Sequence, residues 1–138
     1  MYKLQSKFMR CCENDISYGT MKKMIKENGN TIVIDVRTRD EYRFKHLDGA
    51  INIPMQNICE RIEGVTRNRN DVIILYCEYG SRSKKACNKL RKIGYVNVFN
   101  LSGGIEGVEN WGGAQCAPYP QKNYLMFVSL SSLYVSTK

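Results

Sequence analysis

Short apolar runs rich in β-branched and aromatic residues alternate along the chain with segments of helical period. The clearest apolar runs predict buried strands over residues 31–36, 72–76 and 95–101. A shorter strand is expected over residues 50–53, where Pro54 ends it. Strands and helices that alternate in this way predict an α/β fold, in which a central parallel sheet is flanked by helices on both faces.

Capping residues and apolar spacing predict where the helices begin. Ser17 is expected to cap one helix. Thr38 and Glu41 fit the capping-box pattern, so a short helix should start at Arg39. A weaker helix is expected over residues 56–63.

The longest predicted helix starts at about Ser83 and carries several lysines on its outer side. Its spacing puts Ala86, Leu90 and Ile93 on the buried side. Gly94 is expected to end this helix, because glycine readily adopts the conformation that follows a helix C-terminus.

Cys77 stands where the strand over residues 72–76 ends, and Gly80 then breaks the apolar pattern before the helix. This edge of an open α/β sheet is where ligands bind. Loop N–H groups and the helix N-terminus can converge on whatever Cys77 carries, and a thiol there is expected to ionise easily. Gly80, Ser81 and Arg82 favour such an anion cradle over the alternative, a buried and inert cysteine.

Four ordered motifs carry a resemblance to a known family. They read DVRTRDEY at 35–42, HLDGAINIP at 46–54, CEYGSRS at 77–83 and LSGGI at 101–105. Together, from about residue 17 to about residue 108, they resemble the successive signatures of single-domain rhodaneses. The resemblance implies a rhodanese-like fold and sulfurtransferase chemistry. A sulfane sulfur would pass from a donor such as thiosulfate, through a persulfide on Cys77, to cyanide or a protein thiol.

The same resemblance implies roles for the residues around Cys77. The cysteine would be the nucleophile, and the loop that follows it would bind the substrate through the backbone N–H groups of Glu78, Tyr79, Gly80, Ser81, Arg82 and Ser83. Arg82 would bind the anionic donor or steady the loop. Asp35 and Arg37, at the end of a neighbouring strand, are expected to brace the loop as a mostly structural ion pair. Glu78 adds a negative charge to a loop that should bind anions, which would weaken thiosulfate binding or favour another donor.

Cysteine usage bears on metals and on the compartment. The chain has six cysteines and one histidine, and no cysteine pair has the Cys-x-x-Cys spacing. This pattern argues against the common structural zinc sites, and we expect no metal and no other cofactor. The first eight residues lack the apolar core of a signal peptide, so the cysteines are expected to be reduced thiols in the cytoplasm.

Charge and length indicate the organisation and the partners. The 138 residues are enough for one domain with a proper core, and the net charge of +8 would attract small anions or acidic proteins. We therefore expect a small anionic sulfur donor and an acidic or thiol-bearing protein acceptor. Nucleic acid is a weak option, because no RNA motif or aromatic platform accompanies the basic runs. Residues 1–112 are expected to form the rhodanese-like domain.

The remaining residues, 113–138, are expected to be an apolar tail whose role the sequence leaves open. Its apolar part is shorter than the roughly 20 residues that span a bilayer, so no membrane partner is expected.

Two other functions remain open. A phosphatase or arsenate reductase on the same fold is the less favoured one, because a phosphate-sized oxyanion needs a longer loop. Its arginine would then stand at the position of Ser83. The other is a sulfur carrier or regulatory binding module with little turnover, in which a protein rather than cyanide would accept the sulfur.

Overall fold

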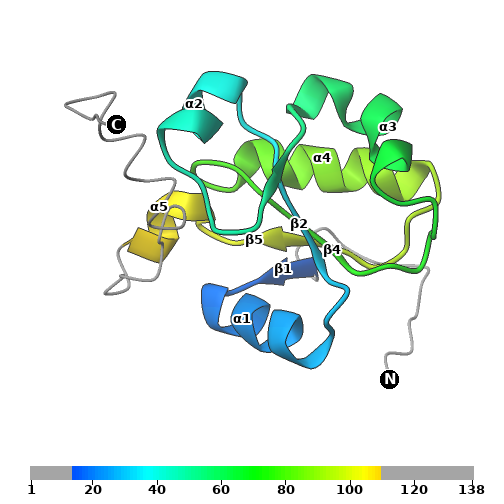
Figure 1. Cartoon of the computed structure of the whole chain (residues 1–138), viewed down its shortest axis with the longest axis horizontal. Coiled ribbons are helices and arrows are strands. Elements are labelled where there is room, and N and C mark those ends of the chain that lie inside the picture. Colours follow the sequence, from blue (N-terminus) through cyan, green and yellow to red (C-terminus); the bar gives the residue numbers. More distant parts are fainter. Residues whose placement is uncertain (1–13, 110–138) are drawn as a thin grey trace, which may run out of the picture.

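The computed structural model of the chain describes residues 14–109. Its five strands form one sheet in which every neighbouring pair is parallel, in the order β1-β5-β4-β2-β3 (Figure 1). The strands are β1 (Asp15–Ile16), β2 (Ile32–Asp35), β3 (Ile51–Asn52), β4 (Ile73–Tyr76) and β5 (Val98–Leu101). The prediction of a parallel α/β fold is confirmed.

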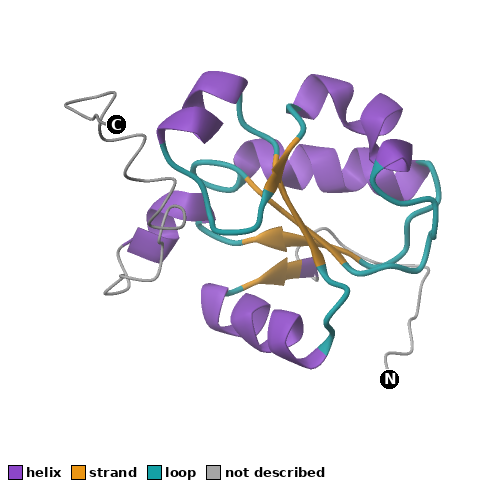
Figure 2. Ribbon diagram, viewed as in Figure 1, coloured by secondary structure: helices purple, strands orange, loops and turns teal. Residues whose placement is uncertain are grey.

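Helices cover both faces of this sheet. They are α1 (Tyr18–Glu27), α2 (Arg39–Phe44), α3 (Ile58–Arg61), α4 (Ser81–Lys92) and α5 (Gly104–Glu109), and short 3₁₀ turns flank α3 at Met55–Asn57 and Ile62–Gly64. In Figures 1 and 2, α3 and α4 lie on one side of the sheet and α1 lies on the other.

Alternation along the strands builds a separate apolar core on each face. In β4, Ile73 and Leu75 pack into the core under α3 and α4, whereas Ile74 and Tyr76 pack into the core that contains residues of α1 and α5. All four side chains are fully buried. A central parallel strand with helices on both faces needs apolar side chains at every position, which is the pattern the sequence shows.

The predicted caps are present. The Ser17 side chain accepts a hydrogen bond from the Thr20 N–H at 3.0 Å and begins α1. At α2, Thr38 Oγ1 accepts from the Glu41 N–H and Glu41 Oε2 accepts from the Thr38 N–H, each at 3.2 Å. Each cap satisfies backbone N–H groups that have no partner within the helix.

The expectation for the longest helix needs two corrections. α4 begins at Ser81, two residues before the predicted start, because Gly80 has a φ of +107° and turns the chain directly into the helix. Ile93 is 38% exposed rather than buried, because it leaves helical geometry at the C-cap. The buried side of α4 contains Cys87 in addition to Ala86 and Leu90.

Strand β1 was not anticipated, and it has only two residues. None of the helices between residues 14 and 109 has both the length and the apolar composition needed to cross a bilayer. The expected domain boundary at residue 112 and the apolar tail at 113–138 lie outside the described residues.

Candidate functional site

Cys77 directly follows β4, the middle strand of the sheet, at its C-terminal end. The chain then makes a tight loop and enters α4 at Ser81. The loop depends on Gly80, which has a positive φ that other residues rarely adopt. A Cβ added at Gly80 would also lie 3.4 Å from the backbone N of Gly103. The strand, the loop and the helix N-terminus thus converge on one sulfur atom.

The Cys77 sulfur is buried under the loop, and the residue is only 1% exposed. Its Sγ accepts hydrogen bonds from the N–H groups of Gly80 at 3.1 Å and Ser83 at 3.3 Å, and the Ser83 hydroxyl lies 3.4 Å away. These donors and the N-terminus of α4 favour a negatively charged sulfur, because they present partial positive charge to it. The arrangement can hold a thiolate or a small anionic group attached to it.

The other loop residues differ in exposure. Tyr79 is 69% exposed, and Ser81 is also exposed. The side chains of Glu78 and Arg82 are about one third exposed, at 32% and 36%. Within the loop, Tyr79 thus faces solvent, whereas the N–H groups of Gly80 and Ser83 face the sulfur.

Two glycines at the start of α5, Gly103 just before the helix and Gly104 as its first residue, bring that helix against the base of the loop. The Ile105 N–H donates to the Cys77 carbonyl at 2.9 Å, and the Glu106 N–H donates to the Glu78 carbonyl at 3.1 Å. A Cβ on Gly104 would lie 2.3 Å from the Glu78 carbonyl oxygen, and Gly104 has a φ of +64°. The LSGGI motif was identified as a family signature, but the structural reason for its second glycine was missed.

Asp35 and Arg37 form a buried ion pair beside the loop. Arg37 Nη2 lies 2.7 Å from Asp35 Oδ2, and Arg37 Nε donates to Asp35 Oδ1 at 3.0 Å. Burial by itself lowers the pKa of Arg37, but the hydrogen bonds and charge of Asp35 outweigh it and raise that pKa. Arg37 Nη1 also lies 3.5 Å from Glu78 Oε1, so the pair reaches the loop through Arg37.

The Arg82 side chain is hydrogen-bonded to α2. Its Nη1 and Nη2 donate to the two carboxylate oxygens of Glu41 at 2.9 and 3.0 Å. The hydrogen bonds from Arg82 are the largest cause that lowers the pKa of Glu41, to about 2. This contact ties the loop to α2, and a role of Arg82 in donor binding stays a prediction.

The Arg82–Glu41 pair should make stability fall in acid. The folded-state pKa of Glu41 lies below its ordinary value of 4.5, so the stabilisation is present above that value and is lost as the pH falls toward about 2. We expect Glu41→Gln to flatten this acid dependence while lowering stability at neutral pH by about 1 kcal/mol or less, as for partly exposed pairs. Urea denaturation at a series of pH values measures both. An unchanged acid slope in Glu41→Gln would show that the pair contributes nothing.

A polar network behind Ser83 was not anticipated from the sequence. The Ser83 hydroxyl donates to Asn100 Oδ1, Asn100 Nδ2 donates to Asp15 Oδ1 at 3.1 Å, and Asp15 Oδ2 lies 3.0 Å from Lys84 Nζ. Ser83 and Asn100 are buried. The network fixes the side chain that faces the Cys77 sulfur. Asn100 lies in β5 directly before the LSGGI motif, and this position is the one sequence signal that pointed toward it.

Within residues 14–109, no three His, Cys, Asp or Glu side chains are grouped so that they would hold a metal ion. Cys87 packs in the apolar core, and Cys59 is exposed on α3. Of the cysteines in this part of the chain, only Cys77 lies at the carboxyl edge of the sheet with donors around its sulfur.

Comparison with models of protein families identifies the family of this chain. The model of the rhodanese-like domain matches residues 17–110, which is more than half of the chain. The chain belongs to the rhodanese-like domain family. The resemblance inferred from the four motifs is therefore confirmed, and the match includes the whole loop from Cys77 to Ser83.

Curated proteins with different described functions are similar to this chain. The chain is 40% identical over 70 residues to the thiosulfate sulfurtransferase PspE of Escherichia coli, covering 51% of this chain and 67% of PspE. It is 29% identical over 99 residues to the putative sulfur carrier protein YrkF of Bacillus subtilis, covering 72% of this chain and 51% of YrkF. The chain therefore spans only about half the length of the second relative.

A solved structure agrees with the fold. The rhodanese-like domain protein of Staphylococcus aureus superposes with a TM-score of 0.62 at 27% identity, covering 72% of this chain and 92% of that one. The similarity to the sulfurtransferase PspE supports a sulfur-transfer role for the rhodanese-like domain described here.

Proposed function

We propose that the protein is a thiosulfate sulfurtransferase in which Cys77 is the nucleophile. The Cys77 thiolate attacks the outer sulfur of thiosulfate, the S–S bond of the donor breaks, and sulfite leaves with the bonding electrons. Cys77 then carries a persulfide. One observation carries this proposal: the buried Sγ accepts the N–H groups of Gly80 and Ser83 at the start of α4. Such donors stabilise negative charge on sulfur as an oxyanion hole does on oxygen.

In the second step, a nucleophilic acceptor takes the outer sulfur and restores the Cys77 thiolate. With cyanide the product is thiocyanate, and with a thiolate the product is a new persulfide. Neither step consumes an oxidant or a metal. A reducing compartment such as the cytoplasm keeps the Cys77 thiol available for the first step. In this mechanism the remaining N–H groups of the loop surround the outer sulfur of the persulfide. Asp35 and Arg37 support the loop in this position.

Glu78 should tune the choice of donor. Its carboxylate is about one third exposed at the loop and only partly offset by Arg37 at 3.5 Å, so it opposes an approaching dianion. We expect Glu78→Gln to raise kcat/KM for thiosulfate by roughly fivefold, which corresponds to about 1 kcal/mol. Glu60→Gln, an exposed change on α3, is the matched control and should have no such effect. If Glu78→Gln and the parent have equal kcat/KM for thiosulfate, Glu78 does not influence the choice of donor.

The identity of the acceptor separates an enzyme from a carrier. The similarity to YrkF, described as a putative sulfur carrier protein, makes a protein thiol a reasonable acceptor for this chain. The exposed lysines of α4, which begins beside Cys77, would suit an acidic partner.

Steady-state rates with cyanide and with reduced thiol proteins test the proposal. Turnover with cyanide that depends on thiosulfate supports a sulfurtransferase. Transfer to proteins only would favour the carrier role, and no transfer to either would overturn both. A parallel assay with an aryl phosphate should show no hydrolysis, and hydrolysis lost in Cys77→Ser would favour the phosphatase alternative.

A further inference from the structure

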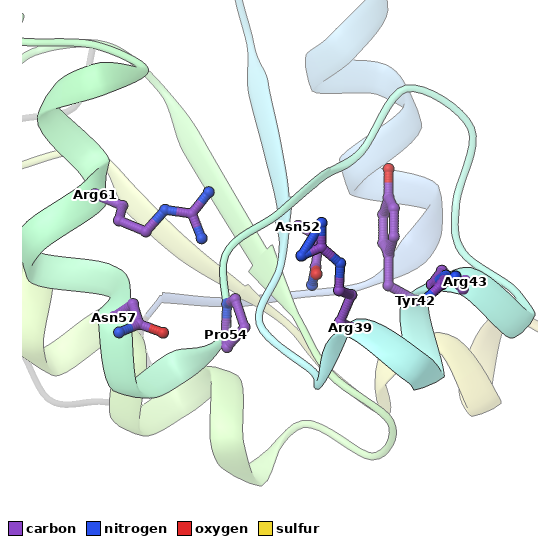
Figure 3. A pocket seen from close by; sticks show the side chains of 7 residues that line it. All are labelled: Arg39, Tyr42, Arg43, Asn52, Pro54, Asn57 and Arg61. Carbon is purple, nitrogen blue, oxygen red and sulfur yellow. The ribbon is translucent and has the colours of Figure 1, made fainter.

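A hollow of about 700 Å³ lies between α2 and α3, outside the loop that holds Cys77 (Figure 3). Its lining residues are Arg39, Tyr42, Arg43, Asn52, Pro54, Asn57 and Arg61. Asn52 is the last residue of β3, so the hollow opens at the carboxyl edge of the sheet. That edge is where open α/β sheets bind ligands, and the volume is in the range of small-molecule sites.

The charge of this hollow is entirely positive. Arginines stand on both of its walls, Arg39 and Arg43 on α2 and Arg61 on α3, and no carboxylate lines it. Arg39 and Arg61 are exposed, and neither side chain makes a hydrogen bond or an ion pair within residues 14–109. Arg43 Nη1 lies 4.0 Å from Asp40 Oδ1, and both of those side chains are largely exposed. Because no carboxylate lines the hollow, the like charges on its two walls repel each other, and an anion between the walls would relieve that repulsion.

The other lining groups indicate the kind of anion. Figure 3 shows the Arg61 side chain extending from α3 toward the space beside Asn52 and Arg39, with Pro54 between the two walls. In the described part of the chain, the Asn57 side chain makes no hydrogen bond, so its amide is available as a further donor. Pro54 and the Tyr42 ring offer apolar surface, because the Tyr42 hydroxyl already donates to the Ala50 carbonyl.

We propose that this hollow binds an anionic ligand that carries two or more linked phosphate groups. The planar guanidinium group donates two parallel hydrogen bonds, a geometry that matches phosphate oxygens. A single phosphate is small for a hollow of this volume with arginines on opposite walls, whereas a chain of phosphates contacts both walls. This binding site goes beyond the proposed sulfur transfer and does not depend on it.

The hollow and the sulfur site share helix α2. Glu41 of α2 holds Arg82 of the loop, and the neighbouring Arg39 and Tyr42 line the hollow. The Asn52 side chain also donates to the backbone carbonyls of Asp35 and Arg37, each at 3.0 Å. A ligand in the hollow would therefore contact elements that also support the Cys77 loop.

Isothermal titration calorimetry with sodium tripolyphosphate and with ATP tests this site on the full chain. The test variant is the double mutant Arg39→Ala/Arg61→Ala, and the control is Lys89→Ala/Lys92→Ala, which removes the same charge from exposed positions of α4. Cys77→Ser is included to separate binding from sulfur chemistry. We expect saturable binding that weakens at least about tenfold in the arginine variant and stays within about twofold in the other two.

The two probes distinguish the sources of the phosphate chain. Equal affinity for both indicates that the phosphates alone are recognised, and tighter binding of ATP indicates that the organic part adds contacts. No saturable binding by the parent protein would overturn the proposal, and so would equal weakening in the arginine and lysine variants, since that reflects general charge. An acidic peptide that binds more tightly than either probe, and loses affinity in the arginine variant, would replace it with a protein-docking site.

Discussion

Cys77→Ser should reduce thiosulfate-dependent formation of thiocyanate by three orders of magnitude or more. The serine hydroxyl fits the space under the loop, but it does not ionise near neutral pH and it cannot hold a transferable sulfur. The N–H groups of Gly80 and Ser83 would still be present in the variant. The loss of activity would therefore come from the missing nucleophile and not from a changed loop. Initial rates of thiocyanate formation measure the effect.

Cys59→Ser is the matched control for this change. Cys59 is exposed on α3, in the part of the chain described, and is not part of the loop. We expect the Cys59→Ser rate to equal that of the parent. Full activity in Cys77→Ser, or an equal loss in both variants, would contradict the assignment of Cys77 as the nucleophile.

Gly104→Ala should have the second largest effect, on both stability and transfer. The added Cβ would approach the Glu78 carbonyl oxygen to 2.3 Å and the Cys77 carbonyl oxygen to 2.6 Å, and these are backbone atoms that cannot move alone. Gly104 also has a positive φ, which costs an alanine about 1–2 kcal/mol. This backbone strain and the steric overlap together should lower the free energy of unfolding by about 2–5 kcal/mol.

Transfer should fall along with stability, because relief of the overlap would displace the base of the Cys77 loop. Gly107→Ala is the control within α5, since the nearest atom to its added Cβ would be the Ser102 carbonyl oxygen at 3.8 Å. That change should be neutral or slightly stabilising, because alanine favours helices over glycine. Urea denaturation and steady-state rates measure both variants. Similar behaviour of the two would show that the close approach at Gly104 has no consequence.

The fold was predictable from the sequence where local physics decides it. Apolar runs gave the strands β2, β4 and β5, and short-range caps such as the Ser17 side chain gave the helix starts. The position of Cys77 followed from the same reasoning, because the strand ends there and Gly80 permits the turn. These features depend on residues only a few positions apart.

The parts that were missed depend on contacts between distant segments. The side-chain pairs Arg37–Glu78 and Glu41–Arg82 each join residues 41 positions apart, and Asn100–Asp15 joins residues 85 positions apart. Strand β1 has two residues and is held by pairing with β5, so no local pattern marks it. Sequence patterns gave the ion pair of Asp35 with Arg37, but they left the partners of Glu78 and Arg82 open.

The arginine-lined hollow shows the same limit. Its three arginines come from two helices, and only the fold brings them to the two walls of one cavity. In the sequence they are separated by ordinary helical spacing and by a strand, and isolated arginines of this kind usually belong to solvated helix faces.

The intact mass of the protein after incubation with thiosulfate tests the central claim most directly, with Cys77→Ser treated in parallel. The account predicts that the parent gains the mass of one sulfur atom, that cyanide or a reductant removes it, and that Cys77→Ser gains nothing. A parent protein that gains no sulfur, or a Cys77→Ser variant that gains it equally, would contradict the proposed persulfide on Cys77.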